Sequence, residues 1–181
     1  FGDNNDNLGG SRVIGHDVLN GGPNDNDLHG ESGDDIHIQG EGTHVNLAER
    51  GFDWVAHKTM NAGVAIDLTD RIVPEQAEFF ADRYIDVEAV SGTIHNDRIW
   101  GDNRMGGDLP AGVPVLDNTA TLFGNELTQE GVDRIAGLRE LLGELMGNDP
   151  AGTFTGGNIL LGGSGSDTIQ GRGGDDVIDG D

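Results

Sequence analysis

The chain contains no cysteine, and it has only ten lysines and arginines against 33 aspartates and glutamates. Disulfide bonds are therefore excluded, so an exported protein of this composition must gain its stability in another way. The formal net charge of −23 argues against nucleic acid and anionic membranes as partners. Only 34% of the residues are hydrophobic and 32 are glycine, so charge repulsion and chain entropy oppose folding unless counter-ions bind.

Long hydrophobic runs and catalytic patterns are also missing. No apolar run is long enough to span a bilayer, and the first residues do not form a signal peptide. There is no Ser/His/Asp or Cys/His arrangement for nucleophilic catalysis, and the scattered carboxylates do not indicate a glycosidase pair. We therefore predict that this chain is not itself an enzyme.

What the sequence does contain is a nine-residue repeat near each end. Residues 162–170 fit the pattern G-G-x-G-x-D-x-U-x, in which U is a large apolar residue, and residues 171–179 fit it except at Arg172. A degraded copy precedes them. The residues at the sixth position are, near the C-terminus, Asn158, Asp167 and Asp176 and, near the N-terminus, Asp17, Asn26, Asp35, the degraded His44 and a displaced Asp6. Since the pattern is in progress at both ends, we expect a segment of a larger protein, in which a missing leader carries no information.

This period predicts a mainly β fold, a calcium-binding parallel β-roll. Six residues of each unit form a turn and three form a short strand, so two units make one coil of about eighteen residues. Turns two units apart then stack, as Asp17 over Asp35, Asn26 over His44 and Asn158 over Asp176. The apolar eighth residues are expected to point into the interior: Leu19, Leu28, Leu160, Ile169 and Ile178.

Stacked turns of this kind offer oxygen ligands for several Ca²⁺ ions. Calcium takes roughly six to eight oxygens, and glycine lets backbone carbonyls approach the ion closely. The residues predicted to contribute are Asp6, Asp17, Gly21, Pro23, Asp25, Asn26, Gly30, Ser32, Asp34, Asp35, Asp97, Asn158, Gly162, Ser164, Ser166, Asp167, Gly171, Gly173, Asp175 and Asp176. The simpler alternative, that these residues merely form turns, accounts for the composition but not for the nine-residue phase.

The middle of the chain is not repetitive, so we predict a β-roll interrupted by insertions that pack on it. The expected divisions are N-terminal rungs at 1–47, an inserted β-rich segment at 48–91, a further rung at 92–102, an insertion at 103–152 and C-terminal rungs at 153–181. Strands are expected near residues 52–56, 64–68 and 84–90, with a short helix from Pro74 to Phe80. In the insertion, an amphipathic helix is predicted over residues 127–146, with the apolar stripe Val132, Ile135, Leu138, Leu142 and Leu145. We expect the two repeat portions to stack into one solenoid.

In the rungs at residues 30–47 the apolar side chains are shifted by one position. Ile36, Ile38, Val45 and Leu47 alternate with His37 and Asn46, which take the inward places. A shift of one residue moves the apolar set to the other face of a strand. We therefore expect an outer face covered by the strands at 52–68 or by the amphipathic helix, with His37 and Asn46 hydrogen-bonded inside. A zinc site is the alternative for the histidines, but His29, His37 and His44 are expected to point in different directions.

The nonapeptides resemble the RTX, or haemolysin-type, calcium-binding repeats of Gram-negative exoproteins. Residues 30–35, 39–55 and 156–167 look like the calcium-binding region of large bacterial haem peroxidases of the animal type. No counterpart of the haem ligand or distal catalytic residues is found, so the chemistry of a peroxidase parent would lie outside this chain. Departures from the motif predict weaker sites at Asn26, His44, Asn158 and Arg172.

The resemblance implies export by a type I secretion system and an extracellular or cell-surface location. Cytosolic calcium lies far below the roughly 10⁻⁴–10⁻³ M dissociation constants of extracellular modules, so the chain would stay unfolded until exported. Two alternatives remain: an adhesion or glycan-binding module, marked by exposed aromatic residues near Trp54 or Trp100, and calcium-triggered self-processing at Asp149-Pro150, a bond that some RTX proteins cleave. For the tryptophans, the competing interpretation is burial in the core.

Overall fold

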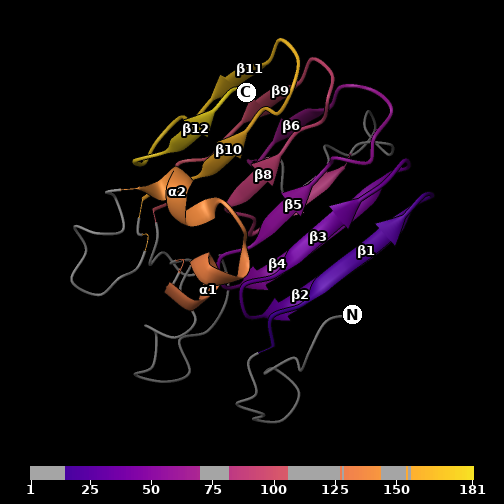
Figure 1. Cartoon of the computed structure of the whole chain (residues 1–181). Helices are drawn as coiled ribbons and strands as arrows, with labels where there is room; N and C mark the ends of the chain where they lie inside the picture. Colours follow the sequence, from indigo (N-terminus) through magenta and orange to yellow (C-terminus); the bar gives the residue numbers. More distant parts are fainter. Residues whose placement is uncertain (1–14, 70–81, 106–126, 128, 144–153, 155) are drawn as a thin grey trace.

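The computed structural model describes residues 15–69, 82–105, 127, 129–143, 154 and 156–181. Its strands are short and pair only in parallel (Figure 1). The strands are β1 (Val18–Gly22), β2 (Asn26–Ser32), β3 (Ile36–Gln39), β4 (His44–Arg50), β5 (Trp54–Ala56), β6 (Ala65–Asp67), β7 (Arg83–Ile85), β8 (Ala89–Ser91), β9 (Arg98–Trp100), β10 (Ile159–Leu161), β11 (Thr168–Gln170) and β12 (Val177–Asp179). The helices are α1 (Gln129–Arg134) and α2 (Leu138–Leu142).

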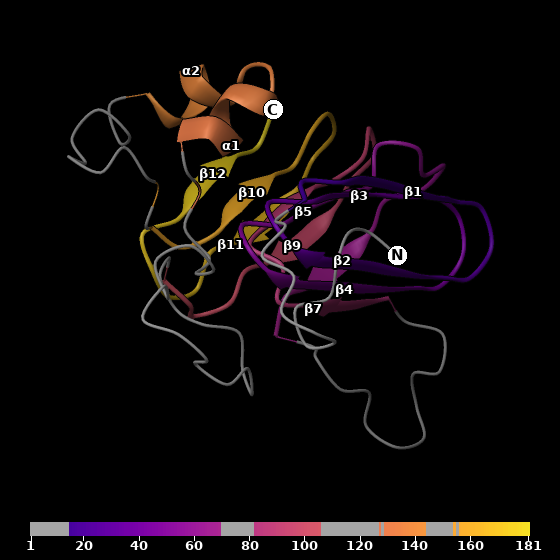
Figure 2. The same ribbon diagram turned by 90° about the horizontal axis from the view of Figure 1, so that it is seen from below.

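The strands form two facing layers, which Figure 2 shows from below. One layer is a continuous six-stranded sheet, called sheet A here, in the order β1-β3-β5-β8-β10-β12. The other layer consists of two three-stranded sheets, β2-β4-β7 and β11-β9-β6. Sheet A runs unbroken from the N-terminal to the C-terminal repeats, and where the repeats are present partners lie eighteen residues apart, as Val18 and Ile36 do. The fold is thus a parallel β-roll, as the nine-residue period predicts.

The middle of the chain belongs to this stack, which corrects the expectation of an inserted segment at 48–91. Strand β5 pairs with β3 and β8, and β8 pairs with β10. The reason is local: Gly51 and Asp53 follow Gly33 and Asp35 by eighteen residues and keep the fourth and sixth positions of the turn. In the other layer the strands do not follow the order of the sequence, since β6 pairs with β9 while the later β7 pairs with β4.

The interior is filled by one residue from each strand. In sheet A the stacked inward residues are Leu19, His37, Val55, Val90, Leu160 and Ile178. The opposite layer contributes Leu28, Asn46, Tyr84, Ile66, Ile99 and Ile169. Of the predicted inward residues, Leu28 and Leu160 are buried, and Leu19 and Ile169 are half-buried. Ile178 is in register with Leu160 but 49% exposed, because β12 is the edge strand of sheet A.

The one-residue shift has the predicted result. His37 and Asn46 lie inside, and His37 Nδ1 is 3.3 Å from Asn46 Oδ1. The amide of Asn46 also donates to Gln39 Oε1 at 2.9 Å. Ile36 instead faces outward and packs with Trp54 against the helices. The covering element is therefore the helical pair, while the strands within 52–68 lie in the sheets.

The predicted single helix over 127–146 is wrong in one respect, because the described part of this segment forms two short helices. The break falls at Gly137, whose φ of 87° is left-handed, and α2 ends at Gly143, whose φ is 48°. Val132, Leu138 and Leu142 are buried against sheet A as the apolar stripe predicts. Leu145, Pro150 and the helix expected from Pro74 lie outside the described residues. No helix within the described part of the chain is long and apolar enough to cross a membrane.

Candidate calcium sites

The residue before each strand of sheet A is acidic or its amide. These residues, called row A here, are in order Asp17, Asp35, Asp53, Glu88, Asn158 and Asp176. Neighbouring strands lie about 4.8 Å apart, so the side chains stack in a file along one edge of the roll. Hydrogen bonds link row A from one turn to the next: Asp17 N–H donates to Asp35 Oδ1 at 2.7 Å, and Asp35 N–H donates to Asp53 Oδ1 at 2.8 Å. Asp53 N–H donates in turn to Glu88 Oε2 at 2.9 Å.

In three residues of row A the second carboxylate oxygen has no hydrogen-bond partner in the described part of the chain. The Oδ2 atoms of Asp17, Asp35 and Asp53 are buried and have no hydrogen-bond partner among the described residues. A buried, ionised carboxylate needs a counter-charge or a donor for each oxygen. The unpartnered oxygens are hard ligands of the kind that calcium takes. The residues present therefore fit a divalent oxygen-seeking cation between successive turns.

Glycine at the first position of the turns that begin at residues 30, 162 and 171 leaves room beside the sixth-position carboxylate. A Cβ on Gly162 would lie 2.5 Å from Asp167 Oδ2, and one on Gly30 or Gly171 would overlap Oδ2 of Asp35 or Asp176. In these three turns an alanine would thus fill the space next to the Oδ2 atom, whereas the turn at 48–53 has Ala48 at this position. This accounts physically for three of the glycines predicted as site residues.

The opposite edge of the roll is less regular. Its sixth-position residues are Asn26, His44, Asp82, Val64, Asp97 and Asp167. Asp97 N–H donates to Asp167 Oδ1 at 2.8 Å, and Asp167 Oδ2 is buried without a described partner. Asp97 Oδ2, in contrast, accepts the Thr93 N–H at 2.7 Å. His44 Nε2 lies 3.0 Å from the Gly40 carbonyl. Only part of this edge therefore offers carboxylate oxygens that the protein leaves unbonded.

The predicted residues divide between the two edges of the roll and the turns around them. Asp17, Asp35, Asn158 and Asp176 lie in row A, and Asp97 and Asp167 lie together on the opposite edge. Asp34 has other partners: it accepts the Phe52 N–H and pairs with Arg134 of α1 at 2.8 Å. Asn26 also lies on the opposite edge, and the predicted residues of the surrounding turns are Gly21, Pro23, Asp25, Gly30, Gly162, Ser164, Ser166, Gly171, Gly173 and Asp175. Asp6 and the side chain of Ser32 lie outside what the structure describes.

Asp53 and Glu88 are row A members that the nine-residue motif does not reveal. The turn at 48–53 reads A-E-R-G-F-D, which has lost the first two glycines of the motif. Its backbone nevertheless repeats that of the turn at 30–35: Glu31 and Glu49 both have φ of 76°, and Gly33 and Gly51 have φ of 131° and 133°. The spacing of eighteen residues from Asp35 was the available signal for Asp53. Glu88 has none, because 35 residues separate it from Asp53.

Transition-metal coordination has no support in the described part of the chain. No group of three or more His, Cys, Asp or Glu side chains there could hold one metal ion. His37 and His44 are bonded to different groups, as given above. It follows that an ion between two turns of row A must take part of its ligands from backbone carbonyls.

Burial changes the pH at which the carboxylates of row A take up protons. Burial raises the pKa of Asp35 to about 7, with the charges of Asp17 and Asp34 adding to the rise and the Asp17 N–H opposing it. The pKa of Asp53 is raised well above its usual range by burial and by the charges of Glu88 and Asp35. A folded chain without ions thus holds protons that the unfolded chain releases near pH 4.

We expect calcium affinity to fall as the pH drops from 8 to 6, because the ion binds the ionised carboxylate and must displace the proton. Below a pKa of about 7 for Asp35, the loss is about tenfold per pH unit for one displaced proton. Calorimetry in buffers of different ionisation enthalpy measures both the affinity and the protons released. In Asp35→Asn the dependence is expected to weaken; an affinity independent of pH in the unmodified chain would contradict the assignment.

Without calcium, the stability of the fold depends on pH through two opposing effects. The raised pKa of Asp35 makes the ion-free fold lose stability as the pH rises from about 4 to about 7. Burial lowers the pKa of His37 and His57 to about 4, so these histidines destabilise the fold as the pH falls below about 6.5. The two effects oppose each other in this window.

Fold and turns together define the class, a β-roll whose stacked turns present carboxylates to cations. The model of the RTX calcium-binding nonapeptide repeat matches residues 14–36 and 153–181, in four copies. These segments contain the turns of Asp17, Asp35, Asn158, Asp167 and Asp176. Neither a curated protein nor a solved structure matches the chain significantly. The chain therefore carries RTX repeats, which bind Ca²⁺, and the middle of the stack lies outside the matched residues.

Proposed function

We propose that this chain is a calcium-binding module that folds on meeting extracellular calcium and stabilises a larger exported protein. The observation that carries the proposal is the pair of buried row A carboxylates Asp35 and Asp53, in each of which Oδ1 accepts an N–H from the adjacent turn and Oδ2 has no described partner. An ion between Asp17 and Asp35, and another between Asp35 and Asp53, would use these oxygens together with carbonyls of the two turns. Folding and ion binding are then coupled, since the unfolded chain has no such sites.

Export by a type I system follows from the same coupling. At cytosolic calcium levels the sites are empty, and an unfolded chain with a net charge of −23 can pass through a narrow channel. Outside, calcium in the millimolar range exceeds the roughly 10⁻⁴–10⁻³ M dissociation constants of extracellular modules, so the chain folds there. Secretion of the parent protein from cells whose medium contains a calcium chelator tests this role; secretion yielding folded, protease-resistant protein in that medium would contradict it.

The parent is proposed to be a haem peroxidase of the animal type. This rests on the resemblance of residues 30–35, 39–55 and 156–167 to the calcium-binding region of such enzymes. The turn at 48–53, which lies within that resemblance, stacks on the turn at 30–35, so two of the three similar stretches are neighbours in the roll. A haem-binding domain in the gene that encodes the chain is the expected finding.

An adhesive role has less support in the part of the chain that the structure describes. Trp54 is buried, and its indole N–H donates to Ser91 Oγ at 2.8 Å. The large hydrophobic side chains that are exposed there are Val18, Ile94, Met105 and Ile178, none of them aromatic. A sugar-stacking platform would require the opposite. Asp149-Pro150 lies outside the described residues, so self-processing stays a prediction.

Asp53→Asn is expected to lower the number of calcium ions bound by about one. Asparagine keeps the oxygen that accepts the Asp35 N–H but replaces the charged ligand oxygen by an amide. Asp133→Asn is the matched control, because Asp133 forms an exposed ion pair with Arg139 at the surface of the helices. Equilibrium dialysis and calorimetry measure the stoichiometry. If Asp53→Asn binds as many ions as the unmodified chain, Asp53 is not a ligand; if the unmodified chain binds none, the proposed function fails.

A further inference from the structure

Row A is interrupted at one turn, which lies between β9 and β10 and is formed by two stretches that are far apart in the sequence. The chain leaves this turn after residues 101–104 and returns to it at 156–158. Here the row A residue is Asn158, an amide, while the neighbouring Glu88 and Asp176 are carboxylates. The interrupted turn therefore cannot repeat the ligand set of a continuous nonapeptide.

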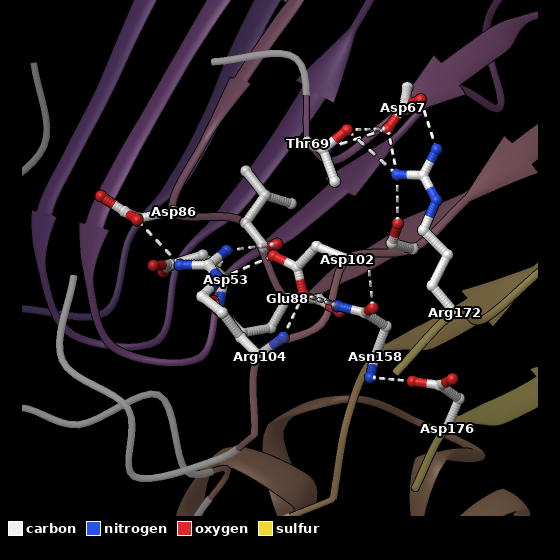
Figure 3. Close-up of polar contacts among 12 residues, drawn as sticks. Asp53, Asp67, Thr69, Asp86, Glu88, Asp102, Arg104, Asn158, Arg172 and Asp176 are labelled. Atoms are coloured by element: carbon white, nitrogen blue, oxygen red, sulfur yellow. Dashed lines mark hydrogen bonds and ion pairs between the residues drawn. The ribbon is translucent and has the colours of Figure 1, made fainter. Parts of the chain in front are cut away.

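Arg104 fills the space between this turn and the turn at 86–88, as Figure 3 shows. Its Nη1 donates to Asp86 Oδ1 at 2.8 Å and its Nε donates to Asp102 Oδ2 at 2.7 Å. Its Nη2 donates to the Val87 carbonyl at 3.2 Å and lies 3.3 Å from Glu88 Oε1. The guanidinium thus collects oxygens from three carboxylates and one carbonyl, which are the chemical types of ligand that calcium takes.

This contact is buried, which distinguishes it from an ordinary surface ion pair. The Arg104 side chain is 16% exposed, and the side chains of its three carboxylate partners are 5–8% exposed. Removing one member of a buried charge cluster leaves the others without compensation, whereas exposed pairs contribute little. The cluster therefore requires a cation at this place.

Asn158 contacts the same cluster from its other side and adds no charge to it. Its Oδ1 accepts the Asp102 N–H at 2.8 Å, and its Nδ2 donates to the Glu88 carbonyl at 3.3 Å. An aspartate could not make the second bond, because an ionised carboxylate has no donor. It would also add a fourth negative charge to the three that Arg104 already balances in part. The amide thus belongs with a cation supplied by the protein.

We propose that Arg104 is a resident cation, which takes the place that calcium holds in the other turns of row A. The junction at which the long segment leaves the roll then forms without an ion, and the calcium ions fall into two groups on either side of it. This inference rests on the proposed calcium-binding function. It adds that one position in the file is closed to calcium.

The test replaces Arg104 by glutamine, which is polar, shorter and neutral. In Arg104→Gln the three carboxylates lose their counter-charge, so the number of bound calcium ions is expected to rise by about one, as measured by equilibrium dialysis. Arg104→Lys is the control, because it keeps a cation and should bind the same number of ions as the unmodified chain. A folded Arg104→Gln variant that binds the unmodified number would overturn the proposal.

A second variant tests the proposal even if Arg104→Gln does not fold. Asp102→Asn leaves Arg104 in place and should not change the number of calcium ions, whereas Asp53→Asn should lower it. A lower number in Asp102→Asn would show that Asp102 binds calcium, contrary to the proposal. An unmodified chain that binds no calcium would instead refute the proposed function, so the two failures are distinguishable.

Discussion

Removal of calcium with a chelator is expected to abolish most of the β structure of this chain, and restored calcium is expected to bring it back. The reason is the charge stored in row A, where carboxylates stack at the strand spacing of about 4.8 Å. Two unit charges at that distance repel by about 3 kcal/mol at an effective dielectric constant of 20. The ion-free fold can relieve this repulsion only by taking up protons, as the raised pKa values of Asp35 and Asp53 indicate, and at neutral pH this proton uptake itself costs free energy.

Calcium shifts the folding equilibrium towards the folded chain, because it binds the folded and not the unfolded state. Each ion bound only by the folded chain adds about 2.7 kcal/mol of stability when its concentration is 100 times the dissociation constant. The hydrophobic interior contributes little stability against this charge, because its inward residues include the polar His37 and Asn46. Loss of the ions should therefore unfold the roll.

The measurement is a calcium titration followed by far-ultraviolet circular dichroism, with magnesium at equal concentration as the control. Folding is expected at about 10⁻⁴–10⁻³ M calcium. Magnesium should not replace it, because that ion demands near-octahedral geometry and gives up water reluctantly. A chain that stays folded in chelator would show that its packed core and its internal cations, such as Arg104, are sufficient without calcium.

The repeats and the interior of the roll could be predicted from the sequence because they obey one period. The phase of Asp17, Asp35 and Asp176 gives the stacking of the turns, and the inward places of His37 and Asn46 follow from the one-residue shift. These features depend on local geometry that nine residues suffice to encode. The predicted covering of sheet A by an apolar helical stripe is confirmed for Val132, Leu138 and Leu142 on the same grounds.

The rest depends on contacts that no local pattern specifies. Glu88 reaches row A from a turn that is not a nonapeptide, and it is placed there by the pairing of β8 with β5 and β10. The crossed order, in which β6 pairs with β9 and the later β7 pairs with β4, has no counterpart in the nine-residue pattern. The break at Gly137 was visible as a glycine, but the continuous apolar stripe outweighed it. Arg104 has a role only once distant segments bring Asp86, Glu88 and Asp102 around it.

Gly51→Ala is expected to be strongly destabilising, although Gly51 lies outside the matched repeats. Gly51 has a φ of 133°, which side chains rarely adopt, and a Cβ there would overlap the carbonyl group of Gly33 in the turn below. Backbone strain costs roughly 1–3 kcal/mol and forced repacking a further roughly 1–3 kcal/mol. In saturating calcium the Tm should therefore fall by roughly 5–20 °C, at about 2–4 °C per kcal/mol for a chain of this size.

Gly180→Ala is the matched control, since nothing lies within 4 Å of a Cβ at that position and its φ is not left-handed. Its effect should stay within about 0.5 kcal/mol, as for other open surface positions. The comparison decides whether the turn at 48–53 is part of the working stack. If it is, Gly51→Ala should also weaken calcium binding, because displacing this turn moves Asp53 away from Asp35 and opens the site between them. An unchanged Tm and unchanged calcium binding in Gly51→Ala would confine the ion sites to the segments that match the repeat.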